Sequence, residues 1–294
     1  MQIEIAYHAK DQLGEGPLWS EAEQAIYWVD ILAPALQRWQ PGSGAYRHWP
    51  LPSEIGSFAL LPGTGALVAL RTGLARLDFA TGDLIPVCAP EADLPGLRFN
   101  DGKCDPRGRF WVGSMDEQPD GNRASLYCLD LAGQCHRMHS GVGISNGLGW
   151  SPDQRTLYYT DSRQHSIYAF DFEPQSGQIT NQRLFVQTPA AYVPDGLCVD
   201  ADGFIWSAMW DGWKVVRFAP DGRVEREIQL PVQRPTSCCF GGPGWQDLFI
   251  TSARVDLSPQ ALRSQPQAGM VFVLPAVGQG IPTAHYLGRY PEKS

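Results

Sequence analysis

Short apolar runs, each interrupted by a turn, dominate the hydrophobic pattern of this chain of 294 residues. Within the runs, Val, Ile, Tyr, Trp and Phe alternate with polar residues, a period of two that is typical of half-buried β-strands. The chain contains 31 glycines and 24 prolines, which punctuate these runs. No window of 12 or more residues keeps a helical apolar period with capping signals. The pattern predicts an all-β protein.

The same arrangement of runs recurs six times, with a loose period of about 45 residues. Each unit opens with a polar residue near a Gly or Ser and continues as four short strands separated by turns. The six starts are marked by Gly16, Gly56, Gly102, Gly147, Gly196 and Ser237. The second strand of each unit is expected at 25–30, 66–71, 109–115, 156–162, 204–210 and 247–253. Six four-stranded units predict a six-bladed β-propeller.

The opening segment at 1–7, MQIEIAY, lies outside the six units and alternates well. We expect it to join the last blade and close the ring, because closure removes an exposed strand edge. The chain is then a single domain over 1–294 without a linker. A pair of β-sandwiches with coincidental spacing is the alternative.

Charge and cysteine content exclude several classes of protein. The chain has 23 Lys and Arg against 31 Asp and Glu, a net charge of -8, which argues against a nucleic-acid or anionic-membrane partner. It shows neither a signal peptide nor the ~18 consecutive apolar residues of a membrane span. Seven scattered cysteines without C-x-x-C spacing predict buried free thiols. We expect a soluble, cytoplasmic protein, and by default a monomer.

Oxygen-bearing residues occupy the same place in several units. In a propeller the first strand of each blade lines the central channel, so equivalent residues form a ring. The residues just before the six markers are Glu15, Ile55, Asp101, Asn146, Asp195 and Thr236. Carboxylates in a narrow channel repel each other unless a cation lies between them. Glu15, Asn146 and Asp195 together predict a site for one divalent cation, and such oxygen ligands leave Ca, Mg, Mn, Zn and Fe(II) all open.

Two other interpretations of these residues were weighed. Asn-Gly and Asp-Gly are common turn dipeptides, and Asp202-Gly203 and Asp221-Gly222 fit that role because they fall between strands of one blade. The register across blades favours a site for the others. The run 143–147 matches the G-x-S-x-G nucleophile elbow, which requires a helix after the serine. Strands are expected there instead, so a serine hydrolase is disfavoured.

Four segments carry a family resemblance: LGEGPLW, RFNDGKCDPRGRFWVGSM, ISNGLGWSPD and PDGLCVDADGFIW. Together they resemble the gluconolactonase/regucalcin family. The resemblance implies a six-bladed propeller with one divalent cation and hydrolysis of sugar lactones to aldonic acids. Carried over by motif, Glu15, Asn146 and Asp195 hold the cation. Asn100 faces the cation or the substrate, and Arg98 contacts the sugar.

One position departs from the family pattern. Relatives carry an acidic substrate contact after a Gly-Thr-Met-like segment, which here is Gly113-Ser114-Met115. Alignment places Gln118 where the acid belongs, with Glu117 beside it. The third substrate contact is therefore open between these two residues. So is the lactone, for which glucono-, xylono-, galactono- and arabinonolactones are candidates.

The expected mechanism combines the cation with one ligand acting as a base. The cation polarises the lactone carbonyl, and Asp195 accepts the proton of the attacking water. Related alternatives are a metal-dependent phosphotriesterase or arylesterase using the same channel, and a calcium-binding propeller without activity. A protein-binding propeller of the tyrosine-tryptophan-threonine-aspartate type is less well supported, because it needs secretion and disulfide-rich neighbouring modules.

Overall fold

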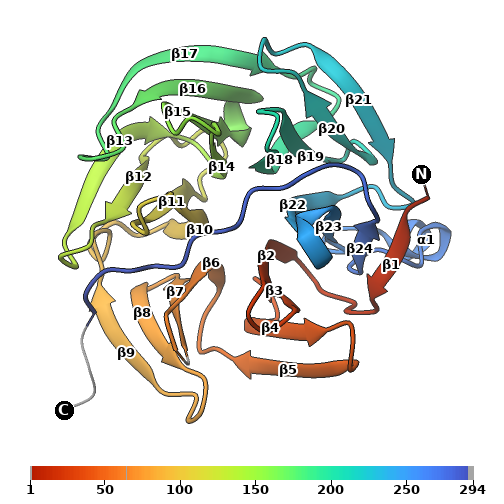
Figure 1. The fold of residues 1–294 in the computed structure, drawn as a ribbon, viewed down its shortest axis with the longest axis horizontal. Coiled ribbons are helices and arrows are strands. Elements are labelled where there is room, and N and C mark those ends of the chain that lie inside the picture. Colours follow the sequence, from red (N-terminus) through yellow and green to blue (C-terminus); the bar gives the residue numbers. More distant parts are fainter. Residues whose placement is uncertain (1, 64, 291–294) are drawn as a thin grey trace.

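The computed structural model describes residues 2–63 and 65–290. They form six antiparallel sheets of four strands each, arranged around a central axis (Figure 1). The predicted all-β, six-bladed β-propeller is confirmed. Every predicted second strand begins within one residue of its observed start.

The blades follow the chain in order, and each has an innermost, a second, a third and an outermost strand. The innermost strands are β2 (Gly14–Ser20), β6 (Ile55–Leu60), β10 (Leu97–Cys104), β14 (Ser145–Trp150), β18 (Val193–Val199) and β22 (Pro235–Gly241). The second strands are β3 (Ala25–Asp30), β7 (Gly65–Leu70), β11 (Phe110–Asp116), β15 (Thr156–Asp161), β19 (Ile205–Trp210) and β23 (Asp247–Ser252).

The third strands are β4 (Ala35–Gln40), β8 (Gly73–Asp78), β12 (Ala124–Leu129), β16 (Ser166–Phe172), β20 (Lys214–Phe218) and β24 (Val271–Leu274). The outermost strands are β5 (Ala45–Pro50), β9 (Leu84–Cys88), β13 (Cys135–Val142), β17 (Ile179–Gln187), β21 (Val224–Gln229) and β1 (Glu4–Tyr7). Three short helical segments lie in connections: η1 (Ser162–Gln164), η2 (Pro243–Trp245) and α1 (Pro259–Ser264). None of the helices in the described part of the chain has the length and apolarity needed to cross a membrane.

The N-terminal strand closes the ring. Strand β1 pairs antiparallel with β24, so that the sixth blade combines the first strand of the chain with its last three. Of the segment 1–7 expected to make this contact, Met1 lies outside the described residues. This pairing completes the last blade, so the ring closes without a gap between the last blade and the first.

The core lies between neighbouring blades. The second strands β3, β7, β19 and β23 are buried along almost their whole length, whereas outer strands such as β5 and β17 are mostly exposed. A strand packed on both faces loses the hydrophobic alternation of a half-buried strand and becomes a continuous apolar run. The seven cysteines are free; five are buried, as expected, and Cys88 and Cys135 are partly exposed.

A buried aspartate accepts a hydrogen bond from a buried tryptophan in three of the blades. Trp111 Nε1 donates to Asp105, and Trp206 Nε1 donates to Asp200. Both of these aspartates also pair with an arginine. The third, Asp11, accepts from Trp28 Nε1 at 2.7 Å and from the neutral Gln37 amide at 2.8 Å. Burial without a cationic partner raises the pKa of Asp11 to about 7.

This environment predicts a pH dependence of stability. The folded protein holds a proton on Asp11 up to a pH of about 7, whereas the unfolded chain loses it near pH 4. The contribution of Asp11 to the free energy of unfolding is therefore largest at low pH, and it falls between pH 4 and pH 7 by as much as about 4 kcal/mol. Urea unfolding from pH 5 to pH 7 should show a smaller decline for Asp11→Asn than for the wild type.

Asp153→Asn is the matched control. Asp153 is exposed, and hydrogen bonds from Ser151 and the Arg155 backbone lower its pKa. Its titration therefore lies below the tested range, and the variant should keep the wild-type slope. An equal decline in wild type and Asp11→Asn would contradict the assignment.

Candidate functional site

The six ring positions lie at equivalent irregularities of the innermost strands. In each of these strands the pairing with the second strand shifts register at the ring position, for example between Glu15 and Leu18 and between Pro194 and Leu197. The other four show the same shift. A β-bulge re-aims a side chain out of the regular alternation. Its repetition gives the six ring residues a common local geometry.

Four of the five marker glycines, all except Gly16, allow neighbouring inner strands to approach closely. A Cβ at Gly147 would lie 2.6 Å from the backbone nitrogen of Leu197 and 2.7 Å from the backbone carbonyl oxygen of Asp195, both in the next blade. At Gly196 it would lie 2.0 Å from the Ser237 hydroxyl oxygen. Both distances are far inside van der Waals contact, so only glycine fits without a shift. These glycines thus allow the inner strands of neighbouring blades to pack closely together.

The carboxylates of Glu15, Asp101 and Asp195 share one buried electrostatic environment. All three side chains are buried. Burial raises the pKa of Asp195 well above its usual range, and the charge of Asp101 raises it further. The pKa of Glu15 is raised by burial and then by Asp195 and Asp101. Placing like charges together away from water is costly, and a cation between them relieves that cost.

Asn146 presents an unused acceptor in this environment. Its Nδ2 donates to the Ser162 hydroxyl at 3.0 Å, and that hydroxyl donates to the Pro194 carbonyl at 2.7 Å. These bonds orient the amide, and its Oδ1 is buried without a hydrogen-bond partner. A buried polar atom without a partner requires an explanation, and an absent ion is one. Within residues 2–63 and 65–290 no three His, Cys, Asp or Glu side chains form a metal-binding group; the predicted set has two carboxylates and one amide.

The two remaining ring positions are chemically different. Ile55 is fully buried and apolar. Thr236 is also buried, and its hydroxyl is already hydrogen bonded to the Gly14 carbonyl and the Thr251 hydroxyl. The ring residues with oxygen atoms that could hold a cation are therefore the predicted Glu15, Asn146 and Asp195, together with Asp101.

Asp101 has its own cationic neighbour. Burial raises the pKa of Asp101, whereas the Lys103 ammonium and the Gly102 N–H lower it. The Asp101 Oδ1 accepts from that N–H at 2.7 Å, and Lys103 Nζ donates to the Leu197 carbonyl at 2.7 Å. Lys103 thus connects the third blade with the fifth and compensates part of the negative charge.

Arg98 and Asn100 form one hydrogen-bonded unit. Arg98 Nη1 donates to Asn100 Oδ1 and to the Phe99 carbonyl, both at 2.9 Å. Asn100 Nδ2 donates to the Ser145 carbonyl at 2.8 Å. Both ends of the Asn100 amide are therefore engaged with the protein. Arg98 is buried and forms no ion pair among the described residues, so its guanidinium has donors left for a ligand.

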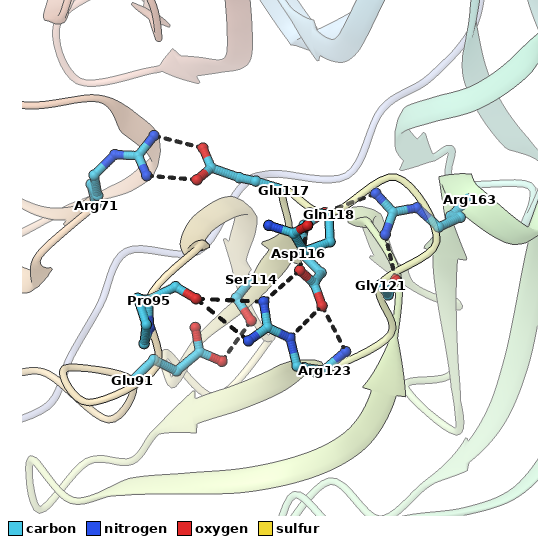
Figure 2. A network of polar contacts seen from close by, with 10 residues as sticks. All are labelled: Arg71, Glu91, Pro95, Ser114, Asp116, Glu117, Gln118, Gly121, Arg123 and Arg163. Carbon is cyan, nitrogen blue, oxygen red and sulfur yellow. Dashed lines mark hydrogen bonds and ion pairs between the residues drawn. The ribbon is translucent and has the colours of Figure 1, made fainter.

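Glu117 and Gln118 lie on the loop after β11 and differ in their engagement. Glu117 accepts two hydrogen bonds from Arg71, at 2.7 and 3.0 Å (Figure 2). Gln118 is exposed, and only its backbone hydrogen bonds, donating to Asp116 and accepting from Gly121, are present among the described residues.

A cavity of about 160 Å³ is lined by all six innermost strands. It touches Asp101 and Lys103 and extends along the second halves of these strands to residues 281–284. The C-terminal segment that contains these residues crosses the ring (Figure 1). It is hydrogen bonded to Ala201 on one side and to Leu60 and Gly108 on the other.

The structure distinguishes between the alternative interpretations of the Asp-Gly dipeptides and of the G-x-S-x-G run. Asp202-Gly203 and Asp221-Gly222 are turns between strands, as predicted. Ser145 begins β14 and is followed by strand β15, so the G-x-S-x-G run lacks the helix of a nucleophile elbow. Sequence reasoning missed Ser162, which orients Asn146, and Arg71, which binds Glu117. Neither carries a local motif, because each acts on a residue of another strand or blade.

The family is shown by comparison with known proteins. A family model described as the SMP-30/Gluconolactonase/LRE-like region matches residues 13–254. The chain belongs to this family. The resemblance predicted from the sequence is confirmed. Relatives with similar sequences are named regucalcin.

Three relatives illustrate the match. Regucalcin of Sus scrofa is 35% identical over 296 residues, covering 98% of this chain and 99% of the relative. The crystal structure of a calcium-binding protein, regucalcin, from Agrobacterium tumefaciens has a TM-score of 0.91 at 30% identity and covers 96% of both chains. A gluconolactonase from Xanthomonas campestris has a TM-score of 0.74 at 24% identity, covering 93% of this chain and 89% of that one, and this likeness concerns the fold.

The close approach of the inner strands predicts the effect of a small substitution. Gly196→Ala adds a methyl group 2.0 Å from the Ser237 hydroxyl and 2.8 Å from the Ser237 Cα, so β18 and β22 must separate. We expect a loss of roughly 1–3 kcal/mol in the free energy of unfolding, seen as a lower Tm. Gly42→Ala, with nothing within 4 Å of the added methyl, is the control and should keep the wild-type Tm. Equal melting of both variants would refute the packing role.

Proposed function

We propose that this protein hydrolyses sugar lactones to aldonic acids with the help of one divalent cation held by Glu15, Asn146 and Asp195. The observation that carries the proposal is the buried Asn146 Oδ1 without a partner, set among carboxylates whose pKa values are raised by burial and mutual repulsion. Membership of the SMP-30/gluconolactonase family supports the reaction class.

The residues present fit a hard divalent cation. Two carboxylates and one amide oxygen match the preference of Ca²⁺, Mg²⁺ and Mn²⁺ for oxygen ligands, and Zn²⁺ and Fe²⁺ also accept carboxylates. Three protein ligands leave positions for water and substrate. When bound, such a cation supplies Lewis-acid polarisation of the lactone carbonyl.

The side chains around this position divide the remaining tasks. The Asp195 carboxylate accepts a proton from the attacking water, because it is a buried acceptor directly beside the position proposed for the cation. Arg98 donates to the sugar hydroxyls through the guanidinium donors that Asn100 leaves unused. Asn100 fixes the direction of Arg98 through their hydrogen bond.

A second candidate function is cation binding without turnover. It is favoured by the Agrobacterium tumefaciens relative, whose structure is described as that of a calcium-binding protein. The same oxygen set serves both functions. Hydrolysis of phosphotriesters or aryl esters in the same channel is a third outcome that substrate panels distinguish.

The proposal predicts cation-dependent lactone hydrolysis. Purified protein should accelerate the opening of glucono-, galactono-, xylono- or arabinonolactone over the spontaneous rate in a pH-stat assay. A chelator should abolish the acceleration, and one divalent metal added back should restore it. Cation binding by calorimetry without acceleration of any lactone would favour the non-catalytic function. Acceleration confined to phosphotriesters or aryl esters would favour the other hydrolases.

Asp195 can be tested separately as the proton acceptor. Asp195→Asn keeps an oxygen ligand but removes the base, so kcat should fall at least about a hundredfold at saturating cation. Cation content should be measured in parallel. Asp221→Asn, in an exposed Asp-Gly turn of the same blade, is the matched control and should retain full turnover. Near-normal kcat in cation-loaded Asp195→Asn would remove Asp195 from the mechanism.

A further inference from the structure

Arg71 holds two carboxylates from different blades. It lies in the turn between β7 and β8, and Glu54 directly precedes β6. Its Nε and Nη2 donate to the two Glu54 oxygens, each at 2.8 Å. Its Nη1 and Nη2 donate to the Glu117 oxygens at 3.0 and 2.7 Å. The planar donor fork of an arginine is suited to this double bidentate contact, and a lysine is not.

The loop that carries Glu117 is held by two sets of contacts that do not involve Arg71. One set lies within the loop, and the other comes from the fourth blade. Asp116 is fully buried and accepts two hydrogen bonds from the Arg123 guanidinium at 2.8 Å. Arg163 donates to the Asp116 carbonyl at 2.8 Å and to the Gly121 carbonyl. These contacts surround the loop in Figure 2. The position of the Glu117 backbone is thereby set before any ligand arrives.

The direction of the Glu117 side chain then depends on Arg71. In Figure 2 the Glu117 side chain extends away from the loop toward Arg71, across to the second blade. Gln118, on the same loop, carries an uncharged amide with no side-chain hydrogen bond among the described residues. The carboxylate nearest to the expected substrate contact is therefore engaged, and the free side chain is neutral.

The charges of this group affect Arg98, the residue proposed to contact the substrate. The pKa of Arg98 is lowered by burial and by the charge of Arg71, and raised by Glu117 and Glu54. Arg98 also pairs with Met115 in the ladder of β10 and β11, two residues before Glu117, so this group lies beside a ligand bound to Arg98. In the intact group, Arg71 offsets part of the negative charge of the two glutamates. Its removal releases two carboxylates beside Arg98.

Resting on the proposed lactonase function, we propose that Arg71 is a positioning residue that sets the charge selectivity of the site. By holding Glu117 and Glu54, it keeps free carboxylates away from the ligand and allows lactones that carry a carboxylate group of their own to be accepted alongside neutral lactones. Gln118 takes the third substrate contact in place of an acid.

The kinetic test compares two lactones that differ in charge, D-glucono-1,5-lactone and the 1,4-lactone of D-glucaric acid. The wild type should hydrolyse both with kcat/KM values within about tenfold of each other. Arg71→Met should lower kcat/KM for the glucaric lactone at least about tenfold more than for the gluconic one at low ionic strength, mainly through KM. Salt should reduce this difference, because the freed carboxylates are partly exposed.

Two further variants separate charge from structure. Glu117→Gln in the Arg71→Met background should restore part of the lost ratio, because it removes one of the two released carboxylates. Arg71→Lys keeps the charge but not the fork and should lie between wild type and Arg71→Met. Arg183→Met, which breaks an exposed ion pair with Asp171 on an outer strand, should leave the ratio unchanged. Should Arg71→Met fail to fold, Arg71→Gln gives the same comparison.

A binding arm separates failure of this inference from failure of the proposed function. Calorimetric titration of D-gluconate and D-glucarate into the cation-loaded protein needs no turnover. Arg71→Met should weaken glucarate binding more than gluconate binding, by the same ratio as in the kinetics. A wild type that rejects the dianion, equal effects on both ligands or a salt-insensitive loss would overturn the role of Arg71. Absence of lactone hydrolysis with the expected binding ratio would instead overturn only the lactonase function.

Discussion

The close contact between neighbouring inner strands is the constraint on which the rest of this structure depends. At Gly147 and Gly196 the next blade approaches so closely that no Cβ fits. This contact brings Glu15, Asp101 and Asp195 into one buried environment although they are far apart in sequence. The β-bulge beside each glycine determines which residue is re-aimed at that point. Packing and site geometry therefore have the same origin.

The buried carboxylates that this packing brings together are explained by a function and not by a gain in stability. Buried carboxylates without cations destabilise a fold, and replacing them with apolar residues is often stabilising. Ile55 occupies one of the six equivalent positions without difficulty, which shows that the blade itself does not require an oxygen there. Lys103 compensates part of the charge at Asp101. The buried Asn146 Oδ1 has no hydrogen-bond partner, and on the proposed function a cation is that partner.

The sequence patterns predicted the features that recur in every blade. Second strands such as β3 and β19 are almost continuously apolar because both of their faces are packed, and their positions were predicted within a residue. The ring residues could be found because they share one place in each unit. The engagement of Asn100 with Arg98, and of Glu117 with Arg71, could not be predicted. The first depends on side-chain rotamers, and the second joins a turn of one blade to a loop of another.

Residues on the inner strands and residues in the connections are therefore under different constraints. The proposed cation ligands lie on inner strands, where a change in backbone geometry would disturb the packing of neighbouring blades. Arg71, Glu117 and Gln118 lie in connections between strands, where residues can change without moving the ring. A family that keeps one scaffold can thus alter the charge presented to its ligand while the oxygen ligands stay fixed. In this chain Gln118 is neutral and Arg71 binds the neighbouring Glu117; on our proposal, these two residues set that charge without any change in the blades.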